Sequence, residues 1–244
     1  MKILISGCSF TKWPEYPGGP NICWPKYLTG QNITNVAEAA AGNQYISDSV
    51  VRGTLADNYD LVLVMWTGVS RLDYLTNIED SNWNALFDSY GFYRRLPHNK
   101  LGYIFSGGQM GTWFKNPVAH KMFYEMYKVS SELSLAAINL MEIVKCQGYL
   151  KSKNVNYRFM SYVDYWNDLK ELSPNGDFGV TGFPEVQDLI KEIDFSKWIF
   201  DGGTRCIYDV AKDMNSFQPD GFHPGDAANQ YWADLITKEI LSAV

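Results

Sequence analysis

The chain opens on Lys2-Ile-Leu-Ile-Ser-Gly-Cys-Ser-Phe-Thr11, an apolar run that changes abruptly into small and polar residues. A short apolar run with such an end is typical of a strand that is buried in a parallel sheet. Two further runs of this kind are Ile33–Ala37 and Leu61–Trp66. Between them, Asp48–Ala56 spaces its apolar residues as on one face of a helix. This alternation predicts an α/β fold with a parallel sheet covered by helices on both faces.

The second half of the chain continues the alternation. Val155–Tyr162 predicts a fourth strand, and Trp198–Phe200 predicts a short fifth one. Apolar residues recur at three- and four-residue intervals from Pro117 to Tyr149, so this segment predicts one long helix. The same spacing predicts a terminal helix over Asp226–Leu241.

Residues 72–116 interrupt the alternation with turn signals and many aromatic side chains. A connection of this length inside a compact domain is usually functional. Because it leaves the sheet beside Thr67, we expect an aromatic-rich insertion that covers the carboxyl ends of the strands. Its aromatic rings could contact a sugar, although packing on one another or on a second subunit is the alternative, so a homo-oligomer stays open.

Composition narrows the class of protein. The chain has 244 residues, enough to bury a substantial core, and we expect one domain over residues 1–244. The formal charge is −6 and no run of Lys or Arg could follow phosphates, which argues against a nucleic-acid partner. No apolar segment is long enough to span a membrane or to serve as a signal peptide. We therefore expect a soluble protein, cytoplasmic or otherwise without a signal peptide, and no membrane partner.

Three polar segments follow the first three predicted strands: Gly7-Cys-Ser9, Ala41-Gly-Asn43 and Thr67-Gly68. The carboxyl ends of parallel strands are where ligands bind in such sheets. Far along the chain, Asp220-Gly-Phe-His-Pro224 precedes the terminal helix. Serine is a poor nucleophile until an imidazole takes its proton and a carboxylate fixes the imidazole tautomer. These segments supply all three groups.

The motifs and their order resemble those of the SGNH, or GDSL-type, hydrolases. Gly7-Cys-Ser-Phe-Thr11 resembles the family's Gly-Asp-Ser block, with Cys8 in place of Asp. Asn35-Val-Ala37, followed by Gly42, resembles the second block, and Asp220-Gly-Phe-His-Pro224 resembles the last. The resemblance implies a three-layer α/β/α sandwich with a mainly parallel, flavodoxin-like sheet. It implies a serine esterase without a metal or organic cofactor, of a type that occurs in bacteria and in their viruses.

The resemblance also implies roles for single residues. Ser9 would be the nucleophile, His223 the base and Asp220 the acid that orients it. The backbone N–H groups of Ser9 and Gly42 would hold the oxyanion.

The third block of the family, normally Gly-x-Asn-Asp, is divergent and reads Trp66-Thr-Gly-Val-Ser-Arg71. The asparagine that would donate to the oxyanion is missing, and loss of one such donor costs about 3–4 kcal/mol of transition-state stabilisation. Asn43 and Thr67 are two alternative replacements, between which the sequence does not choose.

We expect the substrate to be a small acyl ester, for example an O-acetyl group on a carbohydrate. Arg71, Trp66 and Phe10 are the candidate substrate contacts, and Arg71 could hold a carboxylate or form an ordinary salt bridge. The histidines have no second ligand at metal spacing, so no metal site is predicted. The missing asparagine motivates an alternative, a catalytically weakened SGNH-like domain that binds carbohydrate or protein in a larger assembly.

Overall fold

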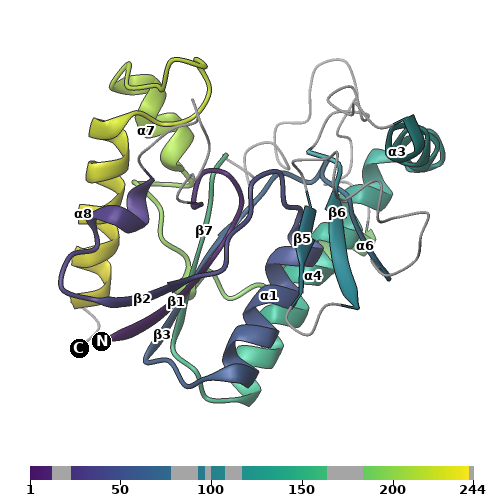
Figure 1. The fold of residues 1–244 in the computed structure, drawn as a ribbon. Coiled ribbons are helices and arrows are strands. Elements are labelled where there is room, and N and C mark those ends of the chain that lie inside the picture. The colour runs from purple at the N-terminus through teal and green to yellow at the C-terminus, as the bar shows by residue number, and fades with distance from the viewer. Residues whose placement is uncertain (13–22, 78–92, 97–99, 108–116, 164–183, 242–244) are drawn as a thin grey trace.

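In the computed structural model, four strands form the parallel sheet that the sequence predicts (Figure 1). The structure describes residues 1–12, 23–77, 93–96, 100–107, 117–163 and 184–241. The strand order is β2-β1-β3-β7, with bounds β1 (Lys2–Ser6), β2 (Asn32–Asn35), β3 (Leu61–Trp66) and β7 (Tyr157–Ser161). The strands that the sequence predicts at Lys2–Ser6 and Leu61–Trp66 are confirmed with these bounds, and the predicted bounds of β2 and β7 differ from the observed ones by one or two residues. All four carboxyl ends therefore lie along one edge.

Helices cover both faces of this sheet, which gives three layers (Figure 1). Those on one face are α1 (Asn43–Ala56), α4 (Glu132–Ser152) and α6 (Pro184–Lys191), with α4 in contact with the other two. Those on the other face are α7 (Ile207–Asp213), α8 (Asp226–Leu241) and the 3₁₀ turn η1 (Trp24–Tyr27). A second 3₁₀ turn, η3 (Phe195–Lys197), contacts β7. The predicted α/β fold with a mainly parallel sheet is confirmed. None of these helices, nor any other in the described ranges, is long and apolar enough to cross a bilayer.

The sheet separates two hydrophobic clusters because successive strand residues point to opposite faces. In β1, Leu4 belongs to the cluster under α1 and α4, while Ile3 and Ile5 belong to the cluster under α8. Trp66, at the end of β3, lies entirely inside the first cluster, with its ring 5.2 Å from that of Phe159.

The prediction of one long helix from Pro117 to Tyr149 is wrong. The segment forms α3 (Pro117–Val129) and α4, which are separated at Ser130 and Ser131. Ser131 has an extended backbone and caps α4: its hydroxyl accepts from the Ser134 N–H at 3.0 Å, and the Ser134 hydroxyl accepts from the Ser131 N–H at 3.0 Å. This reciprocal cap supplies partners for N–H groups that a continuous helix would bond internally.

Part of the 72–116 insertion forms a second sheet that the sequence did not predict. Its strands are antiparallel in the order β4-β6-β5, with bounds β4 (Asp73–Asn77), β5 (Tyr93–Arg95) and β6 (Leu101–Phe105). Rings of Tyr103 and Phe105 in β6 lie 5.3 and 5.1 Å from that of Tyr45 in α1. The sheet therefore packs against the N-terminal end of α1. Residues 78–92, 97–99 and 108–116, with most of the aromatic residues predicted to cover the strand ends, lie outside the described residues.

The short fifth strand expected at Trp198–Phe200 is reduced to a single parallel bridge. Trp198 pairs with Phe159 of β7, and the Ile199 N–H donates to the Phe159 carbonyl at 2.8 Å.

Candidate active site

Ser9 lies in a tight turn directly after β1. The N–H groups of Thr11 and Lys12 both donate to the Cys8 carbonyl, at 2.9 and 3.0 Å. Cys8 is fully buried in the cluster under α8, whereas Ser9 is partly exposed. A Cβ on Gly7 would lie 2.8 Å from the Thr11 Cβ, closer than such atoms approach, so the turn requires glycine. The turn thus buries the Cys8 side chain and leaves the Ser9 side chain partly exposed.

Asp220 and His223 belong to a loop that leads into α8. One Asp220 oxygen, Oδ1, accepts from the backbone N–H groups of Phe222 and His223, both at 2.9 Å. The other, Oδ2, lies 2.6 Å from Nδ1 of the His223 ring. Partial burial raises the pKa of Asp220, but these hydrogen bonds outweigh it and hold the pKa below its ordinary value. An ionised carboxylate therefore holds both the loop and the imidazole.

The two ends of the chain meet at the Ser9 hydroxyl. Nε2 of His223 lies 2.9 Å from Oγ of Ser9. Because Nδ1 faces the carboxylate, it carries the ring proton, and Nε2 is left to accept from the hydroxyl. The structure thus joins the Ser9 hydroxyl, the His223 imidazole and the Asp220 carboxylate in one continuous series of contacts.

Aromatic rings surround the imidazole. The Phe10 ring lies 5.0 Å from the His223 ring and 4.4 Å from that of Tyr162, and Phe10 is 1% exposed. Phe10 therefore supports the imidazole and offers almost no surface to a substrate. Trp66 is also wrongly predicted as a substrate contact, because its side chain lies in the core.

Sequence reasoning missed Phe222. This residue is 40% exposed, and its ring lies 5.4 Å from that of His223. The available signal was a large aromatic residue between the two members of the Asp-x-x-His motif. Phe222 thus presents an exposed aromatic ring next to the His223 imidazole.

The loop that follows β2 is fastened to the Ser9 turn. The Glu38 N–H donates to the Gly7 carbonyl at 3.1 Å, and the Asn35 amide donates to the Thr11 carbonyl at 2.9 Å. Lys12 of the Ser9 turn also forms an ion pair with Glu38 of the loop after β2. Residues between Glu38 and Gly42 are therefore held beside Ser9.

Two of the predicted oxyanion donors beyond Ser9, the Gly42 N–H and the Asn43 amide, are engaged elsewhere. The Thr67 hydroxyl is buried and has no hydrogen-bond partner among the described residues. The Gly42 N–H donates to Oδ1 of Asp73 at 2.7 Å. The Asn43 amide donates to the Thr67 carbonyl at 3.0 Å, and its oxygen accepts from the Thr67 N–H at 2.8 Å. The side chains of Asn43 and Thr67 are fully buried. The sequence predicts that these residues hold the oxyanion, whereas in the structure they fasten α1 to the end of β3 and to β4.

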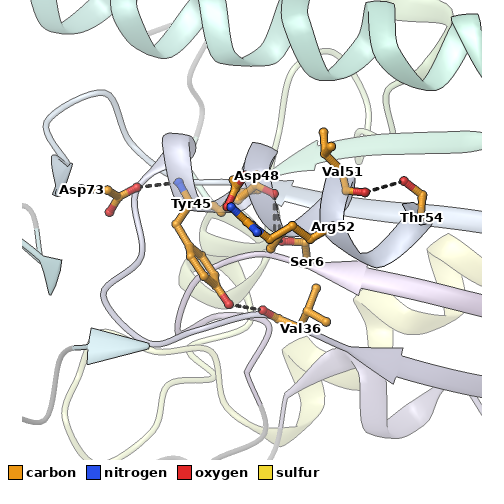
Figure 2. A network of polar contacts seen from close by, with 10 residues as sticks. Ser6, Val36, Tyr45, Asp48, Val51, Arg52, Thr54 and Asp73 are labelled. Carbon is orange, nitrogen blue, oxygen red and sulfur yellow. Dashed lines mark hydrogen bonds and ion pairs between the residues drawn. The ribbon is translucent and has the colours of Figure 1, made fainter. Parts of the chain in front are cut away.

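Asp73, the first residue of β4, caps the N-terminus of α1. Its two oxygens accept from the Gly42 N–H and, at 2.8 Å, from the Tyr45 N–H (Figure 2). Burial raises the pKa of Asp73, the two N–H groups and the Arg71 guanidinium lower it, and the resulting pKa is about 7. The Tyr45 hydroxyl donates to the Val36 carbonyl at 2.8 Å, which ties α1 to the end of β2 (Figure 2).

Ala40 has an unusual backbone conformation for a residue with a side chain, with φ of 66°. Within the described ranges, the N–H groups of Ser9 and Ala40 donate to no other group. The left-handed conformation costs a non-glycine residue about 1–2 kcal/mol, and such strain is usually found at functional sites.

Arg71, the third predicted substrate contact, is 8% exposed. Its Nη1 donates to the Ala41 carbonyl at 3.2 Å, and its guanidinium carbon lies 5.5 Å from the centre of the Tyr162 ring. The described part of the chain holds no carboxylate within ion-pair distance of Arg71, and it contains no cluster of three His, Cys, Asp or Glu residues suited to a metal ion.

No protein-family model matches the chain, and no curated protein matches its sequence. Among solved structures, it is similar to a member of the lipolytic protein G-D-S-L family from Veillonella parvula, at 12% identity and a TM-score of 0.47, over 97% of this chain and 96% of that one. It is also similar to a catalytic mutant of an acetylxylan esterase from Geobacillus stearothermophilus, at 10% identity and a TM-score of 0.47, over 98% and 93% of the two chains. The function is therefore argued from the geometry of the site.

Proposed function

We propose that this protein is a serine esterase of the SGNH type, which hydrolyses a small acyl ester through Ser9, His223 and Asp220. The observation that carries the proposal is the continuous contact from the Ser9 hydroxyl through the imidazole to the Asp220 carboxylate, at 2.9 and 2.6 Å. Ser9 and His223 lie 214 positions apart in the sequence. Alcohol, imidazole and carboxylate in this order are the groups that acyl transfer requires.

The reaction follows from the proton positions. As Oγ of Ser9 attacks the ester carbonyl carbon, Nε2 of His223 takes the hydroxyl proton, and Asp220 stabilises the imidazolium. The imidazolium then protonates the leaving alcohol, which departs and leaves an acyl group on Ser9. Water enters, His223 takes one of its protons, and the hydroxide attacks the acyl carbon. Breakdown of that second intermediate returns the proton to Oγ and releases the acid.

The oxyanion needs hydrogen-bond donors, for which we assign the N–H groups of Ser9 and Ala40. The Gly42 N–H is occupied by Asp73, whereas these two groups have no acceptor in the described residues. The contact between Glu38 and Gly7 holds the Ala40 loop beside the nucleophile. Two backbone donors positioned before the reaction stabilise the developing charge without reorganisation.

An O-acetylated carbohydrate is the first substrate class to test, because Phe222 offers an exposed ring next to the imidazole on which a sugar could stack. The acyl group is small in this proposal.

Hydrolysis of 4-nitrophenyl acetate by purified protein tests the proposal. We expect turnover that falls to background in Ser9→Ala, since removal of a triad nucleophile costs about 10³-fold or more. Ser152→Ala, an exposed serine at the end of α4, is the matched control and should retain full activity. A fluorophosphonate probe should label the unmodified protein on Ser9. Equal rates in the unmodified protein and Ser9→Ala would overturn the esterase and favour the binding module.

A further inference from the structure

We propose that Arg71 binds a carboxylate group of the substrate, so that the preferred ester is an anionic one. This inference rests on the proposed esterase function, since it names the class of ester that the same site accepts.

Arg71 is a buried cation that has no anionic partner at ion-pair distance among the residues that the structure describes. A guanidinium carries five N–H donors, and the hydrogen bond to the Ala41 carbonyl uses only one nitrogen, Nη1. No Asp or Glu of the described residues lies within ion-pair distance of it. A buried charge is costly unless it is paired and hydrogen-bonded. The residue is therefore arranged for a ligand that brings negative charge.

The titratable groups around Arg71 do not meet this need. Asp73 is close enough to interact electrostatically, but its two oxygens are directed to the N–H groups of α1. Tyr162 and Tyr127 also interact with the guanidinium, and burial raises the pKa of both phenols, so neither supplies an anion. Glu142 forms an ion pair with Lys145 on α4.

Arg71 lies at the edge of the sheet that carries the triad. It follows β3, donates to Ala41 in the loop after β2, and lies over the ring of Tyr162, which directly follows β7. Tyr162 contacts Phe10, and Phe10 contacts His223. A series of two contacting aromatic rings therefore links the guanidinium to the imidazole of His223.

A carboxylate fits the donors that are present. The planar guanidinium pairs with a carboxylate through two parallel hydrogen bonds. Gly68 leaves room beside the Tyr162 hydroxyl, because a Cβ at that position would lie 3.3 Å from the hydroxyl oxygen. The neutral phenol can then donate a further hydrogen bond to the same ligand.

Calorimetry on Ser9→Ala, which leaves an ester uncut, tests the site directly. The probes are 4-acetoxybenzoate and methyl 4-acetoxybenzoate, which differ in charge and little in shape. We expect the anion to bind about 10-fold or more tightly, as for a hydrogen-bonded charge. The preference should disappear in Ser9→Ala/Arg71→Gln and persist in part in Ser9→Ala/Arg71→Lys. Ser9→Ala/Arg52→Gln, which removes an exposed arginine of α1, is the control and should keep it.

The carboxylate could belong to the alcohol or to the acyl portion of the ester. A second pair, 4-nitrophenyl hydrogen adipate and 4-nitrophenyl hexanoate, places the charge on the acyl side. A preference for the anion in either pair that depends on Arg71 supports the site and identifies the portion. Equal binding of anion and neutral ester in both pairs overturns it, as does a preference that survives Arg71→Gln.

Turnover separates this proposal from the esterase proposal. In protein with Ser9 intact, Arg71→Gln should lower kcat/KM for the anionic ester about 10-fold relative to its neutral partner. If no ester is hydrolysed in a Ser9-dependent manner, the esterase fails while calorimetry still decides the carboxylate site. If Arg71→Gln does not fold, competition of benzoate for the anionic ester in Ser9→Ala decides: displacement supports the site, and its absence overturns it.

Discussion

Asp220 uses one carboxylate for two tasks, because Oδ1 holds the loop and Oδ2 orients the imidazole. In Asp220→Asn, the amide oxygen can still accept from the loop N–H groups, but the NH₂ group then faces Nδ1 as a second donor. The imidazole would be forced into the tautomer that cannot accept from Ser9. We expect kcat for 4-nitrophenyl acetate to fall by about 10³–10⁴-fold with the fold retained.

The control for this substitution is Asp226→Asn. Asp226 begins α8 and accepts from the Tyr27 hydroxyl, away from the triad, so activity should be unchanged. A loss below about 10-fold in Asp220→Asn, or an equal loss in Asp226→Asn, would contradict the orienting role of Asp220.

Sequence alone could predict which side chains come together at Ser9, because the residue types follow from the chemistry and Asp220 and His223 are close along the chain. It could not predict the oxyanion donors. The engagement of Gly42 depends on Asp73, 31 residues further on, and that contact exists only once β4 has packed on α1. The role of Asn43 could not be predicted either, because its side chain bonds the backbone of Thr67, a contact that exists only in the folded protein.

At the scale of elements, the N-terminus of α1 depends on the absence of a side chain at Gly42. A Cβ there would lie 2.8 to 3.0 Å from the Asp73 carboxylate and would displace it from the helix. We expect Gly42→Ala to lower the free energy of unfolding by about 1–3 kcal/mol, measured by urea titration.

Gly148→Ala is the matched control for this clash. Gly148 lies inside α4, where a Cβ would meet no atom within 4 Å. An alanine in a helix interior should stabilise the protein by about 0.5–1 kcal/mol. If both variants change stability in the same direction, the close approach of Asp73 is not what requires glycine at position 42.

The break between α3 and α4 shows what periodicity cannot detect. Apolar spacing continues across residues 130 and 131, so it predicts one helix, whereas the cap depends on two hydroxyls. We expect Ser131→Ala to lower the free energy of unfolding by about 1 kcal/mol. Ser130→Ala removes only a hydroxyl that donates to the Met126 carbonyl, and its effect should be clearly smaller. Equal losses in urea titrations would argue against the cap.

At the scale of the whole molecule, the parallel sheet and the antiparallel sheet of the insertion meet at the N-terminus of α1. The parallel sheet could be predicted because two of its strands, β1 and β3, are apolar runs with polar residues only at the ends. The antiparallel sheet could not, because its strands are three to five residues long and lie within a segment whose polar and aromatic residues show no clear period. Asp73 connects the two, since it belongs to β4 and binds the N-terminus of α1 beside the Ser9 loop.

This connection should make stability depend on pH. Burial raises the pKa of Asp73 to about 7, above the value of 3.8 for an unfolded chain, so the folded state holds the proton more tightly. The stabilisation that results is complete below about pH 4 and is lost as the pH rises through about 7. Acids with lowered pKa values, such as Asp220, change stability below this window.

Asp73→Asn should remove this dependence, because the amide does not ionise. Between about pH 4 and pH 7, the free energy of unfolding should fall more steeply with rising pH in the unmodified protein than in the variant. Asp188→Asn, which removes an exposed carboxylate of α6, is the control for loss of a charge and should follow the unmodified protein. Urea titrations at several pH values measure the slopes. Parallel slopes for the unmodified protein and Asp73→Asn would mean that Asp73 already ionises near its ordinary pKa, with the helix N-terminus fully offsetting its burial.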